Sequence, residues 1–227
     1  METPRRESRA TRRKAQTSAA ILDAAEGLFR AQGVQATTIE QIAEAANVSV
    51  GSVYVHHRNK QALYLALVER ALDLNEAAMA RVAEAGIASP LERVLAAGEA
   101  YLRFHLEEPG AFQMIALRVL EPASGDVEPA IEERIADRVQ QLVAAVESDL
   151  RAVADAGEIR PDLDLARVVR FLWGAWNGVI ALSLRQDRLR LSEEELTHTL
   201  RLGQELLAGA LRVGNSDQGL TPTSAAP

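Results

Sequence analysis

The feature that most constrains this chain is the segment TTIEQIAEAANVSVGSVYVHHRNKQALY, residues 37–64, which contains two short helical patterns separated by a tight polar joint. A helix of about seven residues is not stable alone in water, so neighbouring elements must hold each of these two in place. A helix-turn-helix needs a small residue where its helices cross and a joint residue that tolerates the left-handed conformation. Ala43 and Asn47 meet these needs, because Asn enters the left-handed region at little cost. The segment therefore predicts a helix-turn-helix whose second helix presents its N-terminal residues to a major groove of DNA.

The charge of the chain is polarised along its length. The net charge is −7, but residues 1–60 contain nine Lys or Arg against six Asp or Glu, a net charge of +3, so residues 61–227 carry −10. A basic front end on an acidic body indicates that one end of the protein meets a polyanion while the rest avoids it. A disordered basic tail without consequence is the alternative interpretation of the charge alone.

The composition argues against several other classes of protein. The chain contains no Cys, which excludes disulfides and thiolate metal sites, and its four His lack a metal-ligand spacing, so we expect no metal and no cofactor. The N-terminus has no apolar signal segment and no run of about 18 apolar residues follows, so we expect a cytoplasmic protein without a membrane partner. Paired carboxylates, a nucleophile–base pair and a phosphate loop are missing from the sequence patterns, so we expect no enzyme.

Helical periodicity extends over the whole chain and predicts an all-α fold. The apolar patterns stop at Gly and Pro residues instead of running through them, which indicates helix ends at these points. The pattern predicts three helices before residue 60 and about six after it. Both ends of the chain, residues 1–15 and 214–227, have the composition of disordered segments.

The segment TIEQIAEAANVSVGSVYVHHRNKQAL resembles the DNA-binding domain of the TetR family of bacterial repressors. The resemblance lies in the Thr-rich start of the first short helix, the Val-Ser-x-Gly-x-x-Tyr core of the second and the Asn-Lys pair that opens the next helix. It implies a basic arm over residues 1–15, an N-terminal three-helix helix-turn-helix DNA-binding domain over 16–60 and a six-helix ligand-binding and dimerisation domain over 61–213. His57 departs from the family, which usually has Phe there. Either this corner is wetter than usual or His57 contacts a phosphate.

The resemblance also implies DNA-binding roles for single residues. The residues expected to contact phosphates are Thr38, Ser49, Gly51, Tyr54 and Lys60. Gly51 would do so through its backbone. Those expected to face the bases are Val50, Ser52 and Val55. The two valines offer only apolar contact, which is best suited to thymine methyl groups. Tyr54 as a core tyrosine and Lys60 as plain helix solvation stay open as alternatives.

Aromatic residues are scarce, with nine in the chain, and six of them lie between residues 101 and 176. The resemblance places a pocket here, where large rings would form a wall for a small apolar or aromatic effector, with His105 and Asn177 as polar anchors. Met114 is an adaptable contact. The expected ligand-binding residues are Tyr101, Phe104, His105, Phe112, Met114, Trp173, Trp176 and Asn177. An ordinary aromatic core is the alternative for each of them.

One helix-turn-helix reads only a few base pairs, so useful specificity requires a homodimer on an inverted repeat. Small residues within FLWGAWNGVIALSL, residues 171–184, form a stripe that would let helices approach closely, and leucines of the last helix could complete a four-helix interface. The expected interface residues are Phe171, Gly174, Ala175, Gly178, Val179, Leu182, Leu196, Leu200, Leu207 and Leu211. Alternatively, these residues pack the core of the monomer.

Together these features predict a ligand-responsive transcriptional regulator. We expect a repressor that binds an inverted-repeat operator in double-stranded DNA as a homodimer and that a small apolar or aromatic effector releases. Release follows if the effector prefers a conformation in which the recognition helices are badly spaced. The alternative is a ligand-independent DNA-binding architectural protein, which would bind without sequence preference.

Overall fold

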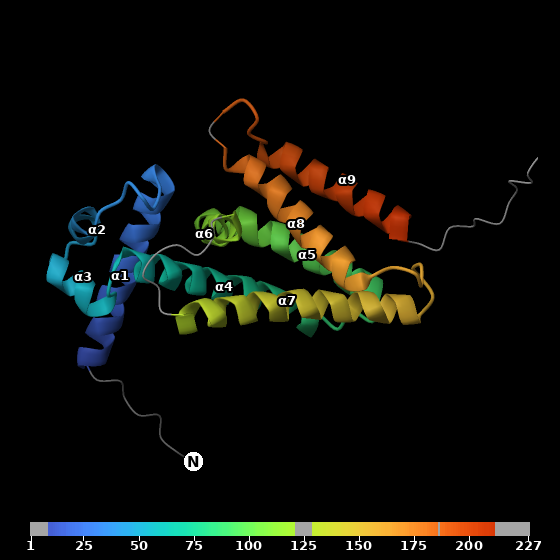
Figure 1. The fold of residues 1–227 in the computed structure, drawn as a ribbon, viewed down its shortest axis with the longest axis horizontal. Coiled ribbons are helices and arrows are strands. Elements are labelled where there is room, and N and C mark those ends of the chain that lie inside the picture. Colours follow the sequence, from blue (N-terminus) through green and yellow to red (C-terminus); the bar gives the residue numbers. More distant parts are fainter. Residues whose placement is uncertain (1–8, 121–128, 186, 212–227) are drawn as a thin grey trace, which may run out of the picture.

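A computed structural model describes residues 9–120, 129–185 and 187–211, and the regular elements of these residues are all α-helices (Figure 1). The all-α expectation is therefore confirmed. The helices are α1 (Arg9–Gln32), α2 (Ile39–Ala45), α3 (Val50–His56), α4 (Lys60–Glu84), α5 (Pro90–Glu107), α6 (Pro109–Leu120), α7 (Pro129–Asp155), α8 (Leu165–Ser183) and α9 (Glu193–Leu211). In Figure 1, α1, α2 and α3 lie together at one end of the molecule, and α4 leads from them into the remaining helices.

The helix-turn-helix has the local geometry that its sequence predicts. The side-chain oxygens of Thr38, Ser49 and Asn59 cap α2, α3 and α4, and they accept backbone amide hydrogen bonds of 3.2, 3.1 and 2.7 Å. Asn47, at the joint, has a φ of 54°, in the left-handed region. Beneath the two short helices, Ile42 and Val53 are fully buried in the same apolar cluster as residues of α1. Contacts with neighbouring helices thus stabilise α2 and α3, which are too short to be stable alone.

Helix α4 joins the N-terminal helices to the rest of the chain through charged and polar contacts. Arg70 of α4 forms ion pairs with Asp23 and Glu26 of α1, the first at 2.6 Å. The Tyr64 hydroxyl donates a 3.3 Å hydrogen bond to the carbonyl of Met114 in α6. Helix α4 is thus joined to α1 by ion pairs and to α6 by a hydrogen bond.

The C-terminal helices enclose a second, smaller apolar cluster besides the main core. It consists of Leu150 and Val153 of α7, Ile159 of the following loop and Val169 of α8, all buried. The amide of Arg160 donates a 2.9 Å hydrogen bond to the carbonyl of Leu211 at the end of α9. These contacts join the end of α7, the start of α8 and the end of α9 on the side of the molecule away from the helix-turn-helix (Figure 1).

Several boundaries differ from the expected ones. Helix α1 begins at Arg9, so residues 9–15 are helical, which corrects the expectation that they belong to a disordered arm. The reason is that six of these seven residues are Ala, Arg or Lys, which are good helix formers, and no Gly or Pro interrupts them. Helix α6 begins at Pro109 itself, because Pro fits the first turn of a helix. The expected arm over residues 1–8 and the tail over 214–227 lie outside the described residues.

Candidate functional site

The surface expected to meet DNA is formed by α3 and the start of α2. Tyr54 and Val55 are 51% and 76% exposed, so the alternative of a core tyrosine is wrong. Gly51 and Ser49 are also exposed, whereas Ser52 is half-buried and Val50 packs partly against the core. The exposed residues of α3 are free to contact another molecule, while Val53 on the opposite side holds the helix to the protein.

Lys60 has a structural role that the sequence did not indicate. Its Nζ donates hydrogen bonds to the carbonyls of Gln35 and Thr37, at 3.0 and 2.9 Å, and so ties the loop before α2 to the start of α4. Plain helix solvation is therefore wrong for Lys60, and its phosphate contact stays a prediction. Thr38 is exposed beside this loop, and its hydroxyl and the Gln41 side chain form a reciprocal capping box.

His57 follows α3 and is half-buried. Its Nε2 is buried without a hydrogen-bond partner, and burial, followed by the nearby His56, lowers the pKa of His57. A lowered pKa favours an uncharged ring at neutral pH. His57 thus packs much as an uncharged aromatic ring would.

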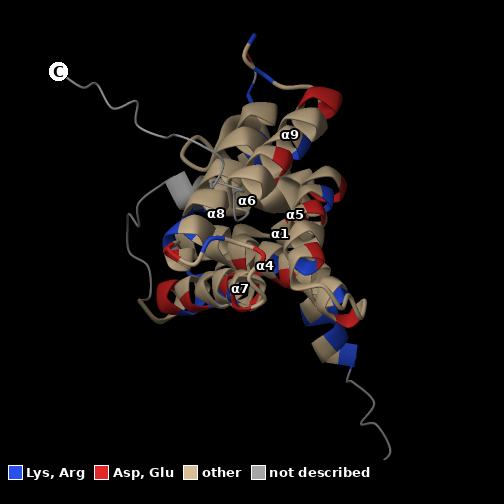
Figure 2. Cartoon of the chain, turned by 90° about the vertical axis from the view of Figure 1, so that its right-hand side faces the viewer, with Lys and Arg blue, Asp and Glu red and all other residues tan. Residues whose placement is uncertain are grey.

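Exposed basic residues also lie at the start of α1. Arg9, Arg12, Arg13 and Lys14 are exposed on the first turns of this helix. Figure 2 shows this basic start of α1 in blue beside the N-terminal end of the chain. Positive charges on a regular helix can be held near a phosphate backbone at a smaller entropic cost than charges on a free tail.

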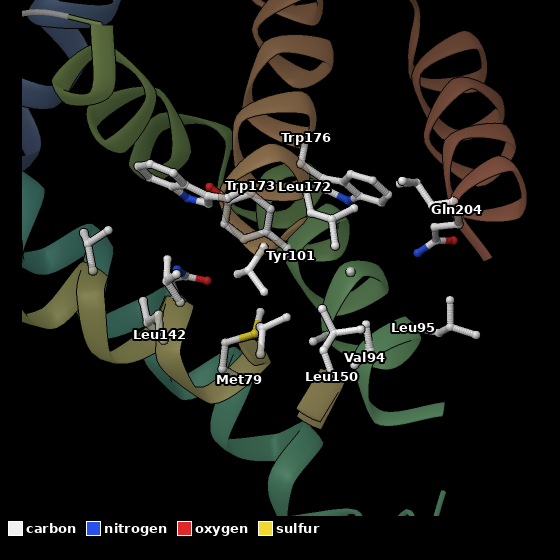
Figure 3. A pocket seen from close by; sticks show the side chains of 18 of the residues that line it. Met79, Val94, Leu95, Tyr101, Leu142, Leu150, Leu172, Trp173, Trp176 and Gln204 are labelled. Atoms are coloured by element: carbon white, nitrogen blue, oxygen red, sulfur yellow. The ribbon is translucent and has the colours of Figure 1, made fainter. Parts of the chain in front are cut away.

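The second candidate site is a cavity of about 170 Å³ between α4, α5, α6, α7, α8 and α9. Three of the expected ligand-binding residues line it: Tyr101, Trp173 and Trp176. In Figure 3 these rings lie on one side of the cavity and Met79, Leu142 and Leu150 lie on the other. Enclosure by aromatic and aliphatic side chains of six helices is typical of a small-molecule binding site.

Asn177 orients the cavity wall instead of lining it. The Tyr101 hydroxyl donates a 3.0 Å hydrogen bond to Asn177 Oδ1, and Asn177 Nδ2 donates a 2.7 Å bond to the Trp173 carbonyl. Burial raises the pKa of Tyr101, so its hydroxyl stays protonated. The expectation that Asn177 anchors a ligand directly is corrected, because both ends of its side chain are already paired within the chain.

The other four expected ligand-binding residues belong to the protein core. Phe104, Phe112 and Met114 are buried and do not line the cavity, and Phe112 packs against the rings of Tyr101 and Phe104 at 5.5 and 6.2 Å between centroids. His105 also lies outside the lining and bonds Ser183 instead. The alternative of an ordinary aromatic core is right for these residues. Helical spacing located a buried face, but it did not indicate which buried side chains border empty space.

Sequence reasoning missed the contribution of α4 and α7 to the cavity. Leu72, Asn75 and Met79 come from α4, and a row of Leu and Val side chains comes from α7. One signal was available: Asn75 is a polar residue on the apolar face of α4, three residues after the buried Leu72 and three before the buried Ala78. A buried polar residue on an apolar face requires a partner or a function.

The residues expected at the dimer interface on α8 differ in their exposure. Phe171 and Leu182 are 65% and 37% exposed, and Gly174 and Gly178 are exposed between them on the same face of α8. Ala175 and Val179 are half-buried, and Val179 packs against the chain's own core.

The leucines assigned to this interface on α9 need correction. Leu196 and Leu200 are buried within the chain, and Leu207 and Leu211 line the cavity. The exposed leucines of α9 are instead Leu202 and Leu206, at 55% and 66%. A periodic pattern allows α9 two apolar stripes, and packing on α5 and α8 decides which one turns inward.

Helix α8 is also the one helix of the described ranges that is long and apolar enough to cross a membrane, with a mean hydropathy of 1.2 and 17% of its residues buried inside the chain. By length and composition alone this is weak evidence for a membrane span. The same exposed apolar surface is what a helix needs in order to pack against a second copy of the chain.

The geometry defines a class of protein: a DNA-binding regulator in which a helix-turn-helix is joined through one long helix to a cavity-bearing helical domain. Residues 21–67 match the family described as bacterial regulatory proteins, tetR family, and residues 94–206 match the tetracyclin repressor-like C-terminal domain. The chain belongs to the TetR family of bacterial transcriptional regulators.

Individual relatives agree with this assignment. The HTH-type transcriptional repressor KstR2 of Mycobacterium tuberculosis (strain ATCC 25618 / H37Rv) is 30% identical over 156 residues, 67% of this chain and 74% of the relative. The regulator UidR of Escherichia coli (strain K12) is 27% identical over 179 residues, 77% of this chain and 85% of the relative. The structure of the M. tuberculosis ketosteroid transcriptional regulator KstR2 matches with a TM-score of 0.65 and 23% identity, covering 87% of this chain and 95% of that one. AibR in complex with isovaleryl coenzyme A and operator DNA matches with a TM-score of 0.63 and 23% identity, covering 86% and 98%.

Proposed function

We propose that this protein is a cytoplasmic, homodimeric repressor that binds an inverted-repeat operator and releases it when a small apolar molecule enters the cavity. The observation that carries the proposal is the course of α4. This helix begins beside α3, is tied to α1 through Arg70, and reaches the cavity with Leu72, Asn75 and Met79. One rigid element thus connects a DNA-facing surface with a ligand-sized cavity.

On the DNA side, α3 would enter the major groove with Val55 and Ser52 facing bases. Tyr54, Ser49 and Thr38 would contact phosphates, which position the helix but carry no sequence information. Apolar contacts by valine side chains distinguish weakly between base pairs, so a single α3 would give modest sequence specificity. Two copies of α3 held at a fixed spacing multiply this discrimination, and this is why the proposal includes a dimer.

The face proposed for the second copy lies on α8 and α9. It contains Phe171, Leu182, Leu202 and Leu206, with glycines between the two α8 residues. A Cβ added to Gly174 or Gly178 would meet nothing within 4 Å in the chain itself, so these positions leave room for a facing helix. Burial of four large apolar side chains supports a stable association.

Release would follow from linkage between the cavity and the spacing of the two α3 helices. Ile115 of α6 lines the cavity, and the first turn of α6 lies against α1, where a Cβ at Gly110 would lie 2.0 Å from Glu26 Oε1. Because α6 contacts both α1 and α4, a ligand that moves α6 would also displace α1. The ligand lowers DNA affinity by its differential affinity for the two conformations, and a few kcal/mol is sufficient.

The test is selection of DNA from a random duplex library by the purified protein, followed by sequencing of the bound fraction. We expect an enriched inverted repeat. Tyr54→Ala should lose the enrichment, while Leu189→Ala, a change at a residue 58% exposed in the loop before α9, should retain it. Enrichment without sequence preference would favour the architectural alternative, and an enriched single half-site would refute the dimer. Turnover of a cavity ligand by the purified protein would refute the non-enzymatic role.

A further inference from the structure

The cavity combines an apolar wall with unpaired polar atoms and no counter-charge. Among the described residues, no Lys, Arg, His, Asp or Glu lines it. Asn75 is 5% exposed, and its Oδ1 is buried without a hydrogen-bond partner. The indole Nε1 of Trp176 is also buried without a partner. A buried acceptor and a buried donor are therefore both unsatisfied in the wall of the same cavity.

The donor lies beside a glycine whose missing side chain lets Trp176 and Gln204 approach the backbone of α5 closely. A Cβ at Gly98 would lie 2.8 Å from Gln204 Nε2 and 3.8 Å from Trp176 Nε1, so both nitrogen atoms surround one backbone position of α5. Figure 3 shows the side chains of Trp176 and Gln204 on the same side of the cavity. Both nitrogen atoms are hydrogen-bond donors, so this end of the cavity suits an acceptor atom of a ligand.

Unpaired buried polar groups reduce the stability of the empty protein, so their presence in a cavity wall needs a compensating partner. A charged ligand would pay the cost of desolvation without meeting an opposite charge, whereas an uncharged polar group can pair with these atoms. The volume of the cavity limits the part of a ligand that it can hold, because a cavity of roughly 150 Å³ is known to hold benzene. A compact molecule of about one or two rings, or a medium alkyl chain, fits a site of this volume.

We propose that the effector is an uncharged, mostly apolar molecule with a hydroxyl or N–H donor for Asn75 and an oxygen acceptor for Trp176, and not a carboxylate or an amine. The inference rests on the proposed function, since it assigns the ligand class of the same cavity. The acceptor meets the indole N–H beside Gly98, and the donor meets the carboxamide oxygen on α4.

Intrinsic fluorescence provides a direct assay, because both tryptophans of the chain line the cavity. The probes are two matched series that differ only in the head group: 1-adamantanol, 1-adamantanecarboxylate and 1-adamantylamine, and octanol, octanoate and octylamine. In at least one series the alcohol should bind at least about tenfold more tightly than both charged analogues, which corresponds to about 1.4 kcal/mol. Equal or tighter binding of a charged analogue overturns the inference, and so does the absence of alcohol binding up to the solubility limit.

Substitution of Asn75 separates a ligand contact from a structural role. Asn75→Leu should raise the melting temperature of the ligand-free protein, because it removes an unpaired buried oxygen, and should weaken alcohol binding at least about fivefold. The matched control is Asn177→Leu, which should lower the melting temperature because Asn177 is paired with Tyr101 and Trp173. Unchanged alcohol affinity in Asn75→Leu overturns the assignment of Asn75, whatever its melting temperature.

The two proposals fail in different ways. A protein that selects an operator but binds none of the alcohols refutes the ligand class and leaves the regulator intact. A protein that binds an alcohol with the expected selectivity but selects no DNA refutes the regulator and leaves the ligand class intact.

Discussion

The buried His105 predicts a loss of stability in mild acid that one substitution should remove. Ser183 Oγ donates a 2.7 Å hydrogen bond to the Ile180 carbonyl, so it accepts the 3.0 Å bond from His105 Nε2–H. The Nδ1 of His105 is then unprotonated, and it is buried without a hydrogen-bond partner. The His105 ring packs on the ring of Phe112, with 4.7 Å between the two centroids. Burial lowers the pKa of His105 from 6.5 to about 4, because a proton on Nδ1 would have no acceptor.

The sign and the size of the effect follow from linkage. The folded-state pKa of His105 lies below the unfolded-state value, so the unfolded chain binds the proton first as the pH falls. The stabilisation is present above pH 6.5 and is lost on acidification towards the folded-state value of about 4. The full shift corresponds to about 3 kcal/mol, of which about 2 kcal/mol is lost by about pH 5. Partial solvent screening reduces these values, so we set the smallest supporting effect at about 1 kcal/mol.

The assay is urea denaturation of the native sequence and of His105→Gln, at one protein concentration, at about pH 7.5 and about pH 5. Gln keeps a donor for Ser183 but takes up no proton. The difference in unfolding free energy between the two proteins should shift by about 1–2 kcal/mol in favour of His105→Gln at the lower pH. Contributions of carboxylates and other histidines cancel in this double difference. A shift below about 1 kcal/mol would refute the reasoning that His105 is held uncharged by burial.

Three further predictions concern the N-terminal helices. Asn47→Ala should lower the unfolding free energy by about 1 kcal/mol because residue 47 has a φ of 54°, and Asn47→Gly should not; urea denaturation distinguishes them. Thr38→Ala should cost about 1 kcal/mol through loss of the α2 cap, while Thr38→Ser keeps both the cap and operator affinity in a gel-shift titration. Arg70→Ala should cost roughly 0.5–1 kcal/mol by removing the ion pairs with Asp23 and Glu26; a cost that does not fall as salt is raised would contradict an electrostatic origin.

The sequence by itself was sufficient for features that depend on residues close together in the chain. Capping by Thr38, Ser49 and Asn59 and the left-handed Asn47 involve neighbours within a few positions, so their residue types predict them directly. The same holds for the helical pattern, which has a period of about 3.6 residues. The exposed Tyr54 on α3 followed from the resemblance of one continuous segment.

Tertiary packing decided everything that depends on the rotation of one helix against another. Periodicity showed that α9 has apolar faces, but contacts with α5 and α8 determined that Leu196 is buried and Leu206 exposed. In the same way, the contacts of α6 with α1 and α4 placed Phe112 in the core and left Asn75 beside the cavity. A helix encodes its own amphipathic face, whereas the identity of the neighbour that covers this face, and any space left between them, depends on segments distant in the chain.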